Sequence, residues 1–325
     1  MRIIAVIATL LVAAFFALRT PDTNAADMVA KYGGPPSAFA EGAKGLDGGA
    51  GLRVHYRDEG CRDCPAIVLI HGSSASLHTF TPLTATLRAR YRIITYDQPG
   101  HGLTGPHPQG DYSADGMAAA LVLVVETLGL DTFTLGGNSM GGWVSWRYAL
   151  ANPERVGALI LIDASGAPPP EDAEPAQLYL GARLLQNPIG QALVQHITPR
   201  NLVKRSLLDS VANPAFVSEA MIDRYWELLR YPGNRRATAL RSVTDRESAY
   251  GKSLPEITAP TLILWGTEDQ VTPVYDAETF ERLIPNARRV MIDDAAHLPM
   301  EEKPTETAAA IEAFMADIAG DEAAQ

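Results

Sequence analysis

The sequence is poor in the features that mark several classes of protein. It has only 2 cysteines in 325 residues, so disulfide bonds cannot carry a fold of this size, which must rest on a large apolar core. It has no run of basic residues, and 27 Lys and Arg against 38 Asp and Glu give a net charge of −11, which disfavours nucleic-acid binding. No two histidines stand four residues apart and there is no second cysteine pair, so the common metal-site spacings are missing.

The remaining composition is that of a folded, globular protein. Hydrophobic residues make up 46% of the chain and charged residues 20%, which excludes wholesale disorder and fibrous repeats. We find neither an internal repeat nor a low-complexity segment.

The N-terminus carries one unbroken apolar run, Ile3–Leu18, between Arg2 and Arg19. It is longer than a signal-peptide core of ~7–15 residues and shorter than a spanning helix of ~17–25 residues, although flanking arginines can snorkel. We therefore expect residues 1–19 to be a membrane anchor or a signal peptide cleaved near Ala25–Ala26. A buried helix is disfavoured because the run has no polar face. Either segment places the chain at the inner membrane facing the periplasm, or in the periplasm, and the Pro- and Gly-rich residues 20–45 are predicted to be a linker.

The two cysteines, Cys61 and Cys64, flank a polar turn between two strand-like runs. A redox-active C-x-x-C motif opens a helix, whereas this one lies in a loop, so redox catalysis is disfavoured. A local structural disulfide and two free thiols both remain open.

From Leu52 onward, strand-like and helix-like segments alternate, which predicts a mostly parallel sheet wound on both faces by helices. The long stretch from Asp163 to Pro260 has no convincing strand and reads as helical, which predicts an insertion over the strand ends. We expect an α/β core over residues 46–165 and 256–320, a helical cap over residues 166–255 and a tail over residues 321–325. The last helix is expected to begin near Pro304 and to end at Gly320.

A candidate nucleophile lies in Gly137-Asn-Ser-Met-Gly141, a G-x-S-x-G sequence between a strand and a helix. A sharp turn in this context lifts Ser139 above the sheet, and the flanking glycines let the backbones come close. Without that context, the same letters would indicate only a Gly-rich turn.

A serine nucleophile needs a base, and the base needs a carboxylate that fixes its tautomer. Asp269 and His297 each follow a predicted strand, which completes the order Ser, Asp, His at the carboxyl ends of the strands. Asp163, also at a strand end, and the neighbouring Glu268 are rivals for the acid.

The backbone N–H groups of Ser73 and Met140 are the candidate oxyanion donors. Ser73 follows a strand in His71-Gly-Ser73, and Met140 follows the nucleophile. His71 is expected to order its loop, and His101 to be structural, since no second base is needed.

These segments together resemble the α/β-hydrolase superfamily, in its capped, esterase-like branch. The motifs that carry the resemblance are His71-Gly-Ser, Asp97-Gln-Pro-Gly-His-Gly102, Gly137-Asn-Ser-Met-Gly-Gly142, Gly266-Thr-Glu-Asp269 and His297-Leu-Pro-Met-Glu-Glu302. The resemblance implies a Ser139–His297–Asp269 triad, no metal or organic cofactor, and a helical cap that shapes the acyl pocket.

Differences from the other branches of the superfamily narrow the range of possible reactions and substrates. Ser139 argues against the epoxide hydrolases and haloalkane dehalogenases, which carry Asp at this position. The carbon–carbon hydrolases of ring-cleavage products carry Trp and Gln after the catalytic His, where this chain has Leu298-Pro-Met300. Cofactor-free haloperoxidases share the triad, and a silent binding module would normally have lost a triad member.

The predicted cap is rich in large apolar residues and shows no basic cluster facing the acyl site, with Arg235 and Arg236 expected in a solvated loop. We therefore expect a small-molecule ester with an apolar acyl group as substrate. The cap residues that motivate this are Leu178, Tyr179, Leu180, Leu184, Leu185, Tyr225, Trp226, Leu228 and Leu229. The carbon–carbon hydrolase is the alternative enzyme, and the binding module is the non-enzyme alternative.

Overall fold

A computed structural model describes residues 13, 15–43, 51–168, 185, 187–244 and 253–324. Its centre is an eight-stranded sheet in the order β1-β2-β4-β3-β5-β6-β7-β8. The strands β1 and β2 pair antiparallel with their neighbours at one edge, and the strands from β4 to β8 along the sheet are all parallel. The strands are β1 (Ser37–Glu41), β2 (Arg53–Gly60), β3 (Ala66–Ile70), β4 (Arg92–Tyr96), β5 (Phe133–Asn138), β6 (Val156–Ile162), β7 (Thr261–Gly266) and β8 (Ala287–Ile292). The predicted mostly parallel sheet is confirmed.

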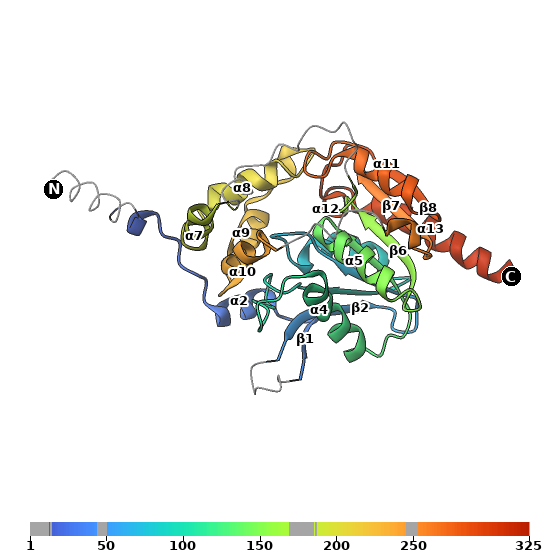
Figure 1. The fold of residues 1–325 in the computed structure, drawn as a ribbon, viewed down its shortest axis with the longest axis horizontal. Coiled ribbons are helices and arrows are strands. Elements are labelled where there is room, and N and C mark those ends of the chain that lie inside the picture. The colour runs from blue at the N-terminus through green and yellow to red at the C-terminus, as the bar shows by residue number, and fades with distance from the viewer. Residues whose placement is uncertain are drawn as a thin grey trace.

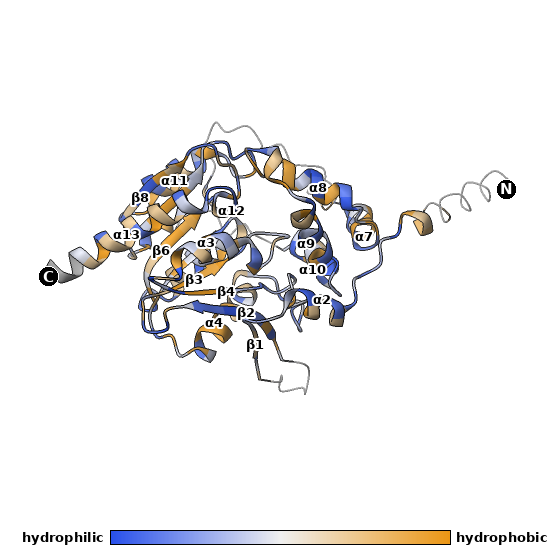
Figure 2. Cartoon of the chain, turned by 180° about the vertical axis from the view of Figure 1, so that it is seen from behind, coloured by the Kyte–Doolittle hydropathy of each residue, from blue (hydrophilic) through white to orange (hydrophobic). Residues whose placement is uncertain are grey.

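Helices cover both faces of this sheet (Figure 1). Successive side chains of a strand point to opposite faces, so Val68 and Ile70 pack on one helical layer and Ile67 and Leu69 on the other. Full burial on both faces explains why β3 and β6 are hydrophobic along their lengths, as Figure 2 shows. The first layer holds α4 (Ala114–Thr127), α5 (Met140–Ala151) and α11 (Val274–Leu283), and the second holds α3 (Thr81–Leu87) and α13 (Pro304–Ala324).

Among the described residues, four further α-helices follow β6 and precede β7, beside the end of the sheet that carries the strand-to-helix turns (Figure 1). They are α7 (Pro188–His196), α8 (Arg200–Leu208), α9 (Glu219–Leu229) and α10 (Asn234–Arg241), and we call them the cap. Helices α8 and α9 share the core of the second layer through Val203, Leu207, Met221 and Ile222. Within the predicted cap of residues 166–255, residues 169–184, 186 and 245–252 lie outside the described part of the chain.

The linker predicted over residues 20–45 is wrong for most of its length. Helix α2 (Ala25–Tyr32) begins at Asn24, whose side chain accepts hydrogen bonds from the N–H groups of Ala26 and Asp27, and it buries Met28. The strand β1 then pairs with β2. Of the residues that suggested a linker, Pro21 precedes α2, and the others lie in the short connection between α2 and β1, namely Gly33, Gly34, Pro35 and Pro36.

The predicted anchor or signal segment lies mostly outside the described residues, of which only Ala13 and Phe15–Leu18 belong to the apolar run. Within the described residues, no helix has the length and hydropathy needed to cross a membrane. At the other end, α13 continues to Ala324, past the predicted stop at Gly320, because a single glycine weakens a helix by only about 1 kcal/mol.

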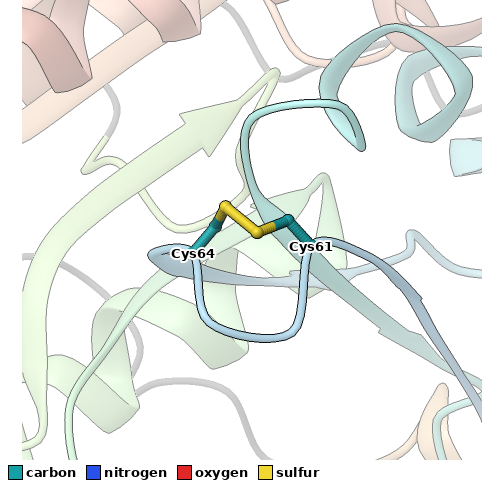
Figure 3. The surroundings of a disulfide bond; sticks show 2 residues. All are labelled: Cys61 and Cys64. Carbon is teal, nitrogen blue, oxygen red and sulfur yellow. A yellow bond between two sulfur atoms is a disulfide. The ribbon is translucent and has the colours of Figure 1, made fainter.

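The turn between β2 and β3 carries a disulfide bond between Cys61 and Cys64 (Figure 3). Of the two alternatives that the sequence left open, the structure therefore has the local disulfide.

A buried carboxylate at the end of β4 ties the first loops of the core together. Asp97 is fully buried and accepts hydrogen bonds from the N–H groups of Leu77 and Leu103, each at 2.8 Å, and its Oδ2 lies 2.7 Å from Nδ1 of His55. Burial alone would favour the neutral acid, but the interaction with His55 holds the pKa of Asp97 well below its usual range. Asp97 is therefore a buried charge whose donors come from three separate segments.

The change Asp97→Ala should lower the free energy of unfolding by about 3–5 kcal/mol, because it strands two buried N–H groups and a buried imidazole. Denaturant titration followed by circular dichroism measures this. Asp63→Ala, an exposed carboxylate in the disulfide turn, is the matched control and should leave stability within about 0.5 kcal/mol. A loss of less than about 1 kcal/mol in the Asp97 variant would show that the network is dispensable.

Candidate active site

Ser139 lies at the junction of β5 and α5 in a strained backbone conformation, with φ 53° and ψ −119°. The turn can be this tight because glycines, which have no side chain, stand at the points where two backbones meet. A Cβ on Gly141 would lie 2.0 Å from the carbonyl oxygen of Ile70 at the end of β3. The structure therefore has the sharp strand-to-helix turn that the G-x-S-x-G sequence predicts, and the N-terminus of α5 points at the serine.

His297 and Asp269 form a buried pair. His297 follows β8, Asp269 follows β7, and Nδ1 of the histidine lies 2.8 Å from Oδ2 of the carboxylate. A carboxylate can only accept, so Nδ1 carries the proton and Nε2 keeps its lone pair. This is the tautomer that a general base requires.

Three further donors hold the Asp269 carboxylate. Its Oδ1 accepts from the N–H groups of Val271 at 2.7 Å and Thr272 at 3.2 Å, and its Oδ2 accepts from the Thr272 hydroxyl at 2.6 Å. Burial pushes the pKa of Asp269 upward, but His297 and these donors outweigh it and hold the pKa below its usual range. Thr272 was not predicted from the sequence, although a hydroxyl three residues after an aspartate is a recognisable local signal.

The rival acids have other environments. Glu268 is exposed, whereas Asp269 is buried. Asp163 is fully buried near the pair, and its Oδ1 accepts from the N–H of Gly266 at 2.9 Å. Burial and the nearby charge of Asp269 raise the pKa of Asp163 well above its usual range, which favours its neutral form. Asp269 is the carboxylate that contacts the His297 imidazole, as a counter-charge to a protonated imidazole must.

The Asn138 side chain joins the nucleophile turn to the histidine loop. Its Nδ2 donates to the carbonyl oxygens of His297 at 3.0 Å and Ile162 at 3.2 Å. The residue directly before Ser139 therefore fixes where the His297 loop lies. From the sequence, Asn138 could be recognised only as part of the G-x-S-x-G motif, because its contact with the distant His297 leaves no local pattern.

The two predicted oxyanion donors lie on adjoining backbones. A Cβ on Gly72 would be 2.9 Å from Oδ1 of Asn138 and 3.1 Å from Cβ of Ser139, so the loop that carries Ser73 rests against the nucleophile turn. Met140 begins α5 on the other side of the serine. In the part of the chain that the structure describes, the N–H groups of Ser73 and Met140 donate no hydrogen bond, so both can receive an anionic oxygen.

Two further buried histidines, His71 and His101, stand in environments that favour the neutral imidazole. His71 Nδ1–H donates to the Gly72 carbonyl at 2.7 Å, and its Nε2 accepts from the N–H of Gln98 at 3.0 Å. Burial lowers the pKa of His71, and burial with the charge of Arg241 lowers that of His101 much further. The expectation that His71 orders its loop is confirmed.

A cavity of about 490 Å³ lies between the core and the cap, with Ser73, Asn138 and His297 in its wall. The cap and the His297 loop line it with aliphatic side chains from Leu185, Val194, Leu202, Val203, Leu207, Leu229 and Leu298. Tyr225 also lines it, as expected, whereas Leu178, Tyr179, Leu180 and Leu184 lie outside the described residues. The cavity is large enough for an acyl chain.

The expected arrangement of arginines is wrong in two respects. Arg235 is not in a solvated loop: it lies in α10 with its side chain only 5% exposed, paired with Asp22 at 2.6 Å. Basic groups also lie near the site, because Arg205 lines the cavity and the buried Arg241 donates to Oγ of Ser73 at 3.4 Å. Arg235 and Arg241 are buried residues of α10, a helix that the adjacent Pro232 and Gly233 had disguised as a loop.

The cap is bonded directly to the His297 loop. The N–H of His297 donates to the Ser210 carbonyl at 3.1 Å. The Glu302 carboxylate accepts from the N–H groups of Ala296 and Ala212, each at 3.0 Å, and so bridges the loop and the cap. Nearby, Glu301 accepts from Tyr225 and Arg224 of α9, both at 2.7 Å.

Comparison with known proteins shows the fold family of the chain. A family model of the alpha/beta hydrolase fold matches residues 65–304. A 2-hydroxy-6-oxononadienedioate/2-hydroxy-6-oxononatrienedioate hydrolase of Burkholderia vietnamiensis is 33% identical over 248 residues, 73% of this chain and 82% of that protein. Lipase 3 of Moraxella sp. is 28% identical over 279 residues, 83% of this chain and 84% of the lipase. The crystal structure of a membrane phospholipase A is 25% identical, covers 97% of this chain and 98% of its own, and has a TM-score of 0.72. The chain belongs to the α/β-hydrolase fold family.

Proposed function

We propose that the protein is a serine hydrolase that cleaves carboxylic esters with apolar acyl groups. The observation that carries the proposal is the buried Asp269–His297 pair, 2.8 Å apart, together with a strained turn at Ser139 and a cavity whose wall includes His297, Asn138 and several aliphatic side chains. The similarity to Lipase 3 supports an ester substrate.

The residues divide the reaction among them as follows. Ser139 Oγ attacks the acyl carbonyl while Nε2 of His297 accepts its proton, and Asp269 holds the imidazolium that forms. The N–H groups of Ser73 and Met140 stabilise the tetrahedral oxyanion. His297 then protonates the leaving alcohol, and water attacks the acyl-enzyme by the same steps in reverse.

The change Ser139→Ala should lower kcat for p-nitrophenyl esters by about four to six orders of magnitude, because no acyl-enzyme forms without the hydroxyl. The measurement is turnover across a series from acetate to palmitate. Ser145→Ala is the matched control, since its hydroxyl is buried in the same helix and bonds only the Gly141 carbonyl at 2.8 Å.

A serine-reactive phosphonate should label the wild type and the Ser145 variant but not the Ser139 variant. Labelling that survives Ser139→Ala would refute the nucleophile. If nothing is turned over while the fold is intact and Ser139 is unreactive, the chain is a binding module.

A carbon–carbon hydrolase is the second candidate. Arg241 beside Ser73 and Arg205 in the cavity wall provide positive charge near an anionic dienoate, and the Burkholderia vietnamiensis relative acts on such compounds by its name. A ring-cleavage dienoate therefore belongs in the same substrate panel. Dienoate turnover far above ester turnover would replace the ester proposal with this one.

The Thr272 hydroxyl offers a test of how the acid is held. Thr272→Val should raise the pKa of Asp269, because it removes the 2.6 Å hydrogen bond to Oδ2 that favours the charged carboxylate. A pH titration of the ¹³C carboxyl signal measures the shift. Thr267→Val is the control, because its hydroxyl faces the Ile292 carbonyl at 3.4 Å. Equal carboxyl titrations in both variants would contradict the role of Thr272.

We also propose that the chain faces the periplasm, held at or released across the inner membrane. The apolar run Ile3–Leu18 and the Cys61–Cys64 disulfide, a bond typical of oxidising compartments, support this. Fractionation should find the full chain in the membrane or periplasm, and deletion of residues 2–18 should retain it in the cytoplasm. An intact full-length chain in the soluble cytoplasm would contradict both forms of the proposal.

A further inference from the structure

A second cavity, of about 250 Å³, lies where the N-terminal segment crosses the cap. Its wall combines three stretches of chain: Arg19, Pro21 and Asp22; Gln195 and His196; and Gly233, Arg235 and Arg236. It is distinct from the acyl cavity, which takes Val194 and Thr198 from the same turn of chain. Nothing in the proposed ester reaction uses it.

The wall includes the N-terminus of helix α10. Gly233 precedes the helix in a left-handed conformation with φ 87°, and no side chain caps this end. The first N–H groups of a helix have no partner within it, and the helix dipole adds partial positive charge there. An uncapped helix start that opens on a cavity is suited to bind an anion.

Arg235 provides an independent indication of a missing ligand. Its side chain is 5% exposed, and Nη2 donates to Asp22 at 2.6 Å. Its Nε and Nη1 are buried and have no hydrogen-bond partner among the described residues. Buried guanidinium donors are rarely left unpaired, because each costs about 1–3 kcal/mol.

Positive charge exceeds negative charge around this cavity, although the whole chain has a net charge of −11. Arg19, Arg235 and Arg236 line it with only Asp22 as a carboxylate. Arg230 lies close behind: burial and the positive charge of Arg235 both lower the pKa of Arg230. An anion in the cavity would offset this repulsion.

We propose that the cavity binds a phosphate group, on a monoester or a diester, seated on the N-terminus of α10 between Arg19, Arg235 and Arg236. A carboxylate has two oxygens and is satisfied by one guanidinium, whereas phosphate presents more acceptor oxygens to converging donors. The group would join the N-terminal segment, the end of α7 and the start of α10. Its source is a phospholipid headgroup or a soluble phosphate ester. The lipid is the nearer source because Arg19 follows Phe16 and Leu18, whose side chains are 66% and 61% exposed.

Isothermal titration of inorganic phosphate into the full chain in nonionic detergent tests the site, with sodium chloride of equal ionic strength as the blank. We expect Arg235→Met and Arg236→Gln to weaken binding at least about tenfold each, as loss of one charge-assisted contact implies. Arg62→Gln, an exposed arginine in the disulfide turn, is the matched control and should bind like the wild type. Arg236 is itself exposed, so its variant remains informative even if the Arg235 variant does not fold.

Vesicle flotation then distinguishes the two sources. If the ligand is a lipid headgroup, Arg236→Gln should lower retention on phosphatidylglycerol vesicles and leave retention on uncharged galactolipid vesicles unchanged. If the wild type and the Arg236 variant are retained equally on both kinds of vesicle, while phosphate binding still depends on the arginines, the ligand is a soluble phosphate ester. The proposal is overturned if phosphate gives no heat above the blank, or if both arginine variants bind it like the wild type. These outcomes do not depend on ester turnover or on Ser139.

Discussion

The site depends on one constraint, the close approach of three backbones at the carboxyl ends of β3 and β5 and the start of α5. Ser139 stands above the sheet because α5 begins very close to β3. A Cβ on Gly141 would lie only 2.0 Å from the carbonyl oxygen of Ile70, so only glycine fits there. Gly72 lets the loop that carries Ser73 come equally close to the Ser139 turn from the other side. The same close packing therefore positions the proposed nucleophile and the proposed oxyanion donors. The positive φ of Ser139 is a local cost that the packing of buried strands on both sides offsets.

His297, the proposed base, is held by the core and by the cap together. Asp269 and Asn138 fix His297 from the core, through its ring and its carbonyl respectively. Ser210 fixes it from the cap through its N–H, and Glu302 ties the preceding residue to the cap as well. A movement of the cap that broke these bonds would therefore release the catalytic loop from one of its two supports.

The mostly parallel sheet and the three candidate site residues, Ser139, Asp269 and His297, could be predicted from the sequence, because each prediction depends on local patterns: apolar strand runs, a Gly-rich turn and polar residues at strand ends. Features that depend on contacts between residues far apart in the sequence could not be predicted from it. Residues 20–45 looked like a linker because their glycines and prolines are local, whereas the pairing of β1 with β2 is not. Arg235 looked solvated because Asp22, its partner, is more than two hundred residues away. Asp163 and Asp269 stand at equivalent strand ends, and only burial and hydrogen bonding separate the neutral acid from the charged one.

The two cavities share a wall, and that wall is bonded to the N-terminal segment. The N–H of Thr20 donates to the His196 carbonyl at 2.8 Å, and its hydroxyl accepts from the N–H of Thr198 at 2.7 Å. Thr198 lines the acyl cavity and His196 lines the arginine-rich one, while the Thr198 carbonyl accepts from the Trp226 indole at 2.8 Å. The position of this turn is thus set jointly by the N-terminal segment and by α9. The wall of the acyl cavity at Thr198 is therefore held by the N-terminal segment as well as by the cap.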